Sequence, residues 1–203
     1  MKEKLLENHK RYLDRINFYK KFSYDVEEER KFILEKSYPL YGDIVEVGTG
    51  KGYFTVELAK EGYNFTSIDI SDDEQEFARF NIKYFGFEKL VDFRIENAEH
   101  LSFDNSSFDI IFSINTIHHL TNPVKVIEEL IRIATLEGKI ILSDFTEDGL
   151  KIIDKVHAAE GRVHKAGRTN LSEVGNYLER RGFSIQKHKS RFQKILIAYR
   201  QII

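Results

Sequence analysis

Three glycines within ten residues are the feature of this sequence with the clearest chemical use. Val45–Phe54 reads VEVGTGKGYF, in which Gly48, Gly50 and Gly52 follow a short apolar run. Because glycine has no Cβ atom, a ligand can approach the backbone closely at such a turn, and the first amides of a following helix can donate hydrogen bonds to it. The stretch therefore predicts a binding loop between a buried strand and a helix.

Two acidic residues accompany this loop. Glu46 lies in the strand before the glycines, and Asp69 ends the next apolar run, FTSID. A separation of about 20 residues is the one expected for a carboxylate that accepts hydrogen bonds from ribose hydroxyls. Each acid also has a structural interpretation, Glu46 as a buried hydrogen-bonded carboxylate and Asp69 as a helix cap. Their place beside the glycines favours a nucleoside site.

The composition narrows the class of protein. The chain has 203 residues, of which 41% are hydrophobic, a net charge of −2 and no cysteine. This length suits one domain or one domain with an appendage, and nothing in the overall charge balance favours a nucleic-acid partner. The lack of cysteine excludes disulfides and thiol catalysis, and no histidine pair has acidic partners at ligand spacing, so we expect no metal site. No segment reads as a signal peptide or a membrane span, which predicts a cytoplasmic protein.

Two helices are expected before the glycine loop. Apolar residues recur at helical spacing over about residues 4–21 and again over 26–35, before Pro39 interrupts the pattern. We therefore predict an N-terminal helical cap at residues 1–40, followed by a ligand-binding domain at residues 41–203.

From residue 43 onward, short apolar runs alternate with amphipathic segments. Strands are expected at residues 44–47, 65–70, 91–95, 108–114 and 139–145. Helices are expected at residues 53–60, 72–84 and 123–134. This alternation predicts a doubly wound α/β sheet of parallel strands, which binds ligands outside the carboxyl ends of its strands. Glu46, Asp69, Asn97 and Asn115 all fall at or just beyond such ends.

The last part of the chain follows a different pattern. Residues 147–169 are polar and partly helical, and a further helix is expected at residues 171–181, with Gly182 as its stop. Two closing apolar runs, at residues 183–188 and 192–199, are separated by only a few residues. Because that gap is too short for a helical crossover, we expect an antiparallel hairpin.

Taken together, these motifs resemble the class I S-adenosylmethionine-dependent methyltransferases. The resemblance covers about residue 43 to the C-terminus and rests on EVGTGKG, SIDIS, NAEHLSF and FDIIFSINTIHHL, in that order. It implies a Rossmann-like, mostly parallel seven-stranded sheet in which the final hairpin inserts a reversed strand. It also implies S-adenosylmethionine as the cofactor and S-adenosylhomocysteine as the product.

The resemblance assigns the glycine loop and its acid to the methionine end of the cofactor. Gly48, Gly50 and Gly52, together with Thr49 between them, would pass close to this part of the molecule. Glu46 would lie near its amino group.

The same resemblance assigns residues to the nucleoside and the sulfonium. Asp69 would accept hydrogen bonds from both ribose hydroxyls, and Ile70 would pack on the adenine. Asn97, where family members often have Asp, would meet the exocyclic amine, and the backbone of Ala98 would meet the ring edge. At the end of the fourth strand, Ile114 and Asn115 would lie beneath the sulfonium.

Candidates for catalysis and acceptor binding come from three segments. His118 and His119 follow the fourth strand and are candidates for a general base, although adjacent residues usually point in different directions. Lys165 and Arg168, in the stretch HAAEGRVHKAGR, could recognise an anionic acceptor. Tyr24, between the two N-terminal helices, is the best candidate for a lid residue. The structural interpretation of the stretch HAAEGRVHKAGR is a solvated surface loop. The structural interpretation of the N-terminal aromatic residues is an amphipathic helix that buries one face.

Several alternatives stay open at this point. An NAD enzyme would need GxGxxG, but here the third glycine comes early, at Gly52, and Tyr53 takes the position of the expected glycine. The sequence INTIHHL lacks the Asn or Asp followed by Pro-Pro of amino-methylating nucleic-acid and protein enzymes, which favours a small-molecule acceptor. An RNA or protein methyltransferase in a complex, or a non-catalytic binding protein, remains possible. The choice among O, C and N acceptors and the oligomeric state are open.

Overall fold

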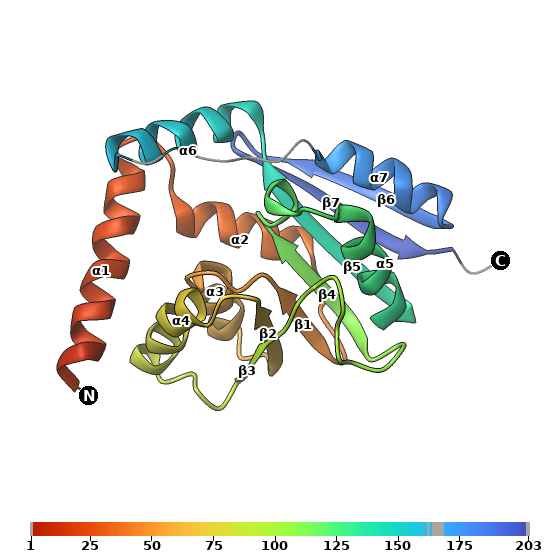
Figure 1. Ribbon diagram of the computed structural model, residues 1–203, viewed down its shortest axis with the longest axis horizontal. Helices are drawn as coiled ribbons and strands as arrows, with labels where there is room; N and C mark the ends of the chain where they lie inside the picture. Colours follow the sequence, from red (N-terminus) through yellow and green to blue (C-terminus); the bar gives the residue numbers. More distant parts are fainter. Residues whose placement is uncertain (1, 162, 164–168, 202–203) are drawn as a thin grey trace.

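The computed structural model describes residues 2–161, 163 and 169–201. Its centre is one seven-stranded sheet with helices on both faces (Figure 1). The strands are β1 (Ile44–Val47), β2 (Phe65–Asp69), β3 (Val91–Ile95), β4 (Phe108–Ile114), β5 (Ala134–Phe145), β6 (Phe183–Lys189) and β7 (Gln193–Arg200). Their order across the sheet is β3-β2-β1-β4-β5-β7-β6. The predicted mostly parallel sheet with a closing antiparallel hairpin is confirmed, since only β7 runs against its neighbours β5 and β6.

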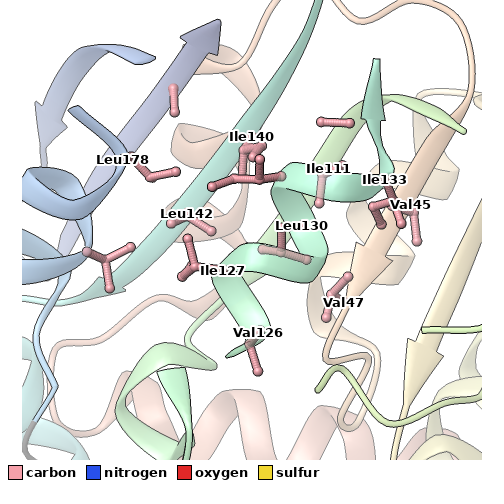
Figure 2. Packing of buried hydrophobic residues seen from close by; sticks show 14 of the residues in the cluster. Val45, Val47, Ile111, Val126, Ile127, Leu130, Ile133, Ile140, Leu142 and Leu178 are labelled. Carbon is pink, nitrogen blue, oxygen red and sulfur yellow. The ribbon is translucent and has the colours of Figure 1, made fainter. Parts of the chain in front are cut away.

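Seven α-helices and one short 3-10 helix, η1, surround this sheet in the described part of the chain. They are α1 (Lys2–Lys20), α2 (Val26–Lys36), α3 (Tyr53–Lys60), α4 (Asp72–Phe85), η1 (Ile117–His119), α5 (Pro123–Ile133), α6 (Glu147–Ala159) and α7 (Leu171–Arg180). Helices α5 and α7 share one buried apolar cluster with the sheet, and α2, α3 and α4 contribute to another. Figure 2 shows the first cluster, where side chains of α5 face those of β1, β4 and β5.

Local sequence explains where the helices begin. The Ser71 hydroxyl accepts a hydrogen bond from the Glu74 amide at 3.2 Å, as expected for the cap of α4. Asn170 and Glu173 form a reciprocal capping box at the start of α7. These ends fix the lengths of the crossovers and therefore the positions of the strand ends that they connect.

One strand is longer than the sequence pattern indicates. We expected a helix to residue 134 and a strand from residue 139, but β5 begins at Ala134, which pairs with Phe108. The register then shifts between Phe108 and Ile110. The residues between Ala134 and Lys139, TLEG, hide this start, because they form no apolar run and two of them are exposed.

The strand order creates a crevice at the carboxyl ends of β1 and β4. The chain leaves β1 toward β2 and β3, whereas it leaves β4 toward β5 and the hairpin. The connections therefore diverge at this point, which is where ligands bind in doubly wound sheets. The glycine loop after β1 and the loop after β4 form the two sides of this crevice.

The two N-terminal helices are joined to the sheet domain by polar contacts. In α1, Asn8 Nδ2 donates to Asn81 Oδ1 of α4 at 2.8 Å. After α2, the carbonyl oxygens of Ser37 and Pro39 each accept from Lys139 Nζ at 2.5 Å. Within the described residues, no helix is long and apolar enough to cross a membrane.

Candidate cofactor and acceptor site

A cavity of about 590 Å³ lies at the carboxyl ends of β1, β2 and β4. Its lining includes most of the residues that the sequence assigns to a cofactor, namely Glu46, Gly48, Thr49, Gly50, Asp69, Ile70, Asn97, Ala98, Ile114 and Asn115. The loops after four different strands thus meet around one space, as the strand order requires. Gly52 is the assigned residue that lies outside this lining.

The three glycines of the loop serve different purposes. Gly50 has a φ of +50°, and a Cβ atom there would meet nothing within 4 Å, so its backbone faces open space. Gly52 has a φ of +79°, and its Cβ would lie 2.7 Å from Cβ of Ala78 in α4. At Gly48 the overlap would be with Thr116 Oγ1, at 2.5 Å. Gly50 is therefore the position where a ligand can approach the backbone, whereas the other two allow close packing of protein on protein.

Glu46 is a buried carboxylate with two hydroxyl partners. It is 1% exposed, and its Oε2 accepts hydrogen bonds from Thr55 Oγ1 and Ser67 Oγ, both at 2.7 Å. Burial raises the pKa of Glu46 to about 7, although the two hydrogen bonds oppose the shift. Ser67 Oγ is also 2.7 Å from Thr49 Oγ1, so the loop and the acid belong to one polar network. The acid is held in place and titrates near neutral pH.

Asp69 connects the end of β2 to the glycine loop. Its Oδ2 accepts from the Gly50 amide at 2.7 Å, and its Oδ1 accepts from the Ser71 amide at 2.9 Å. The helix cap that was the alternative explanation for Asp69 is provided by Ser71 instead. Asp69 is half-buried and lines the cavity, so its oxygens can also face a ligand.

The far end of the cavity combines an exposed apolar side chain with a polar turn. Ile70 is 69% exposed, which is unusual for a large aliphatic residue beside a buried strand. Across from it, Asn97 Oδ1 accepts from the Glu99 amide at 2.9 Å, which leaves its NH₂ group for another partner. Ala98 follows Asn97 in the lining. A flat ring with a hydrogen-bond acceptor at its edge fits this combination.

A polar network supports the floor below the end of β4. Asn115 has a φ of +55°, a conformation that Asn tolerates better than most residues. With its amide oriented so that both atoms have partners, Asn115 Oδ1 accepts from Arg30 Nη2 at 2.7 Å and its Nδ2 donates to Gln193 Oε1 at 2.9 Å. Arg30 is 8% exposed and lines the cavity. Helix α2 therefore places a cation beside Glu46 and Asn115.

The two adjacent histidines face different surroundings. His119 lines the cavity, whereas His118 is 6% exposed and lies outside the lining. His118 Nδ1 is 2.5 Å from Asp144 Oδ1, and the His118 amide donates to Asp144 Oδ2 at 3.1 Å. The ring centroids of the two histidines are 4.0 Å apart. Of the pair, only His119 can contact a bound acceptor directly.

The remaining candidates for acceptor binding lie away from the cavity or outside the described residues. Tyr24 is 1% exposed, and its hydroxyl accepts from Gln193 Nε2 at 3.0 Å, so it supports the cavity floor from behind instead of covering the opening. Lys165 and Arg168 are not among the residues that the structure describes. Among those that are, no group of three or more His, Asp or Glu side chains is placed to hold a metal ion.

Comparison with known proteins identifies the family. The model of a family described as a methyltransferase domain matches residues 42–196, which is most of the chain. This protein belongs to that methyltransferase-domain family. The fold agrees: a SAM-dependent methyltransferase from Aquifex aeolicus superposes with a TM-score of 0.64 at 20% identity, over 83% of this chain and 88% of the other.

Two curated relatives indicate how far the similarity extends. Methyltransferase GfsG of Streptomyces halstedii is 28% identical over 137 residues, covering 66% of this chain and 49% of the relative. Norajmaline N-methyltransferase of Rauvolfia serpentina is 28% identical over 109 residues, covering 53% of this chain and 37% of the relative. The chain spans about half or less of the length of these relatives, so the match concerns their shared domain.

Charge distinguishes the cavity of this methyltransferase-family domain from a site for a nucleotide. Its lining carries five carboxylates, Glu46, Asp69, Glu74, Glu96 and Glu99, but only two cationic side chains, Arg30 and Lys51. A pyrophosphate would be repelled by this excess of negative charge, whereas a sulfonium compound with an amino group would be attracted. The charge balance thus disfavours a pyrophosphate group in this cavity.

Arg30 lines the cavity, although the sequence pattern did not assign it to the site. The helix expected at residues 26–35 is observed as α2, but none of its residues was assigned to the site. Val26, Arg30, Ile33 and Leu34 are the buried residues of α2, at a spacing that puts them on one face. A lone arginine on the apolar face of a short helix was the signal that could have identified it.

Proposed function

We propose that this domain transfers the methyl group of S-adenosylmethionine to a small-molecule acceptor. The observation that carries the proposal is the pairing of opposite charges at the end of the cavity below the glycine loop. There, buried Glu46 and Arg30 both line the space, and Asn115 bonds to Arg30 at 2.7 Å. The methionine part of the cofactor bears an ammonium and a carboxylate, which match this acid and this cation.

The other lining residues support the remainder of the assignment. Asp69 would accept hydrogen bonds from the ribose hydroxyls, and exposed Ile70 would be covered by the adenine. The Asn97 oxygen already accepts a hydrogen bond from the Glu99 amide, so its NH₂ group is the donor that remains. Asn97 would therefore recognise a ring nitrogen of the adenine as acceptor, or the exocyclic amine after its amide group rotates by about 180°. The cofactor could approach the backbone of Gly50 closely, because a Cβ atom there would meet nothing within 4 Å. Each of these contacts uses a group that the structure leaves facing the cavity.

The chemistry asks little of the protein beyond positioning. Bound S-adenosylmethionine supplies a methyl group on a positively charged sulfur, and an acceptor lone pair forms the new bond while the carbon–sulfur electrons return to sulfur. Ile114 and Asn115 would fix the floor under the reacting atoms, which favours an in-line approach. An acceptor hydroxyl or acidic carbon also loses a proton, and His119 lines the cavity where it can accept one.

A small acceptor is favoured over a nucleic acid by the same charges. The acidic residues of the lining would oppose the phosphates of an RNA strand near the cofactor. The name of the norajmaline relative describes methylation of the nitrogen of a small molecule. Both observations support a metabolite, and neither selects among O, C and N.

The proposal is tested by measuring S-adenosylhomocysteine release from S-adenosylmethionine in the presence of an acceptor panel. Phenols, catechols, enolisable quinone precursors and secondary amines should be included, with a short RNA as a comparison. We expect acceptor-dependent release with at least one small molecule and none with RNA. Release with RNA alone would contradict the small-molecule assignment. Tight cofactor binding without release across the panel would favour the non-catalytic alternative.

A further inference from the structure

A second cavity, behind the glycine loop, has the opposite charge. It has a volume of about 220 Å³ and lies between α1 and α4. Three cationic side chains, Arg11, Arg15 and Lys51, contribute to its lining, which includes no carboxylate among the described residues. The lining of the cofactor cavity beside it carries more carboxylates than cationic side chains, so the two spaces differ in the sign of the charge that they favour.

The cations of this second cavity differ in how far they are neutralised. Arg15 forms an ion pair with Glu160 after α6, and Lys51 Nζ is 3.8 Å from Glu74 Oε2. Arg11 has no carboxylate within 4.0 Å among the described residues. Its guanidinium lies 5.5 Å from the centre of the Phe77 ring, and Lys51 Nζ lies 5.9 Å from the same centre. Two positive charges thus approach one aromatic ring, and an anion bound in the cavity that both residues line would offset part of their charge.

The walls of the cavity are already organised without a ligand. Asn8 and Asn81 are buried, and the bond between their amides holds α1 against α4. Asn81 Nδ2 also donates to the Lys51 carbonyl at 3.1 Å, which fixes the backbone of the loop. The rings of Tyr12 and Tyr53 stack with centroids 5.3 Å apart. A preformed wall lowers the entropic cost of binding, so a small ligand could bind here with useful affinity.

The two cavities are neighbours. Lys51 and Tyr53 contribute to the lining of both. A molecule that placed its reactive end near the cofactor could therefore extend past these residues toward Arg11. An anionic substituent on such a molecule would be repelled by the acidic rim of the first cavity and attracted by the second.

We propose that the cavity between α1 and α4 binds a phosphate or carboxylate group of a small molecule. The group belongs either to the methyl acceptor or to a separate anion that binds beside it. Anion binding itself is independent of the proposed methyl transfer, whereas the acceptor as its source rests on that function.

Inorganic pyrophosphate is a suitable probe because it carries two linked phosphates and lacks a base or a ring. It should be titrated calorimetrically into the full chain saturated with S-adenosylhomocysteine, at a constant ionic strength of about 0.15 M. We expect saturable binding that Arg11→Gln weakens about tenfold, because a charge-assisted hydrogen bond is lost. The matched control is Lys10→Gln, which makes the same charge change one residue away on α1, outside the lining; it should change the affinity less than about twofold.

The outcomes separate this proposal from the preceding one. An absence of saturable pyrophosphate binding, or equal weakening by the two variants, would overturn the anion site. Affinity for S-adenosylhomocysteine should be the same in the wild type and in both variants, because neither side chain lines the cofactor cavity. Pyrophosphate binding in a protein that binds no sulfur nucleoside would leave this inference standing and contradict the proposed function.

Kinetics then identify the source of the anion. If the acceptor supplies it, pyrophosphate should compete with the acceptor, and an acidic acceptor should have a lower KM than its neutral analogue in the wild type but not in Arg11→Gln. If a separate anion binds, pyrophosphate should alter kcat without competing, and the two analogues should have equal KM values.

Discussion

At the scale of single residues, the cofactor assignment depends most on Glu46, because its protonation changes the charge that the ligand meets. The carboxyl is buried, and its pKa is raised from 4.5 to about 7. An ammonium binds the carboxylate form more strongly than the neutral acid. The affinity for S-adenosylmethionine should therefore depend on pH in a range where most proteins are stable.

We predict that this affinity falls roughly fivefold or more between pH 7.5 and pH 6.0, as Glu46 takes up its proton. The α-amino group of the ligand, with a pKa of about 8, stays mostly charged in this range. Glu46→Gln should bind more weakly and show a flat profile. Calorimetric titrations at four pH values are sufficient, and a wild-type profile as flat as that of the variant would contradict the assignment.

The same shift predicts the pH dependence of stability in the free protein. Between pH 4.5 and about 7, the folded state holds more protons at Glu46 than the unfolded state does. This residue's contribution to the free energy of unfolding is therefore complete below pH 4.5 and is lost as the pH rises through about 7. Urea titrations at several pH values should show that the free energy of unfolding declines less between pH 4.5 and about 7 in Glu46→Gln than in the wild type.

Substitution of each of the two histidines should affect a different property, turnover in one case and stability in the other. His119 lines the cavity, so His119→Ala should lower kcat by about 100-fold, if the acceptor loses its proton to a base, with cofactor affinity unchanged. His118 bonds to Asp144 within the protein, so His118→Ala should mainly lower the free energy of unfolding, by about 1–3 kcal/mol. Full turnover in His119→Ala would remove the proposed base.

At the scale of elements, the connection from β1 to α3 depends on close contact with α4. Gly52 combines a positive φ with a Cβ position 2.7 Å from Ala78 Cβ. Gly62 provides a control, because its φ is also positive, at +82°, but a Cβ there would meet nothing within 4 Å. Alanine at either position strains the backbone, whereas only alanine at Gly52 also overlaps α4.

We predict that Gly52→Ala lowers the free energy of unfolding by about 1–3 kcal/mol more than Gly62→Ala does. The common backbone strain, about 1 kcal/mol in each variant, cancels in the comparison. Urea denaturation followed by circular dichroism gives both values. Equal destabilisation would show that α4 moves aside without cost, and would contradict the packing role of this glycine.

The same elements show what the sequence could predict. The bounds of β1, β3 and β4 were predicted to the residue, because β1 and β4 are mostly apolar and β3 alternates apolar with charged residues, each between polar turns. The start of β5 was missed, because Ala134 pairs with Phe108 through a register shift that leaves no apolar run in the sequence. Motifs at strand ends predicted which loops meet, and the cavity lining agrees.

The parts of the site that were missed depend on tertiary contacts. Arg30 comes from a helix before the sheet, and the pattern of α2 can indicate that this side chain is buried but not that it contacts Asn115. The bond between His118 and Asp144 joins residues 26 apart, so sequence spacing could not tell which histidine faces the cavity. Such contacts follow from how the helices pack on the sheet, which a single sequence does not specify.

At the scale of the whole molecule, the N-terminal helices share buried contacts with the sheet. The predicted division at residue 40 is crossed by the bonds of Lys139 to Ser37 and Pro39, and by the bond of Arg30 to Asn115. Helix α1 extends along one side of the molecule in Figure 1, and its Asn8 bonds to α4. These contacts make independent folding of residues 1–40 unfavourable, because their buried polar groups would lose partners.

We therefore predict one cooperative unfolding transition. Scanning calorimetry and circular dichroism should give the same Tm, and the calorimetric and van't Hoff enthalpies should agree. A separate early transition, removed by deleting residues 1–40, would show instead that the helical cap is an independent unit.

The central claim is that the acidic cavity below the glycine loop binds a sulfur nucleoside. The most direct test is calorimetric titration with S-adenosylmethionine, S-adenosylhomocysteine and NAD, for the wild type and for Asp69→Ala. We predict dissociation constants of about micromolar for the two sulfur nucleosides, no binding of NAD, and severe weakening in the variant, which loses the ribose acceptor and the bond to the Gly50 amide. Binding of NAD alone, or unchanged affinity in Asp69→Ala, would contradict this account.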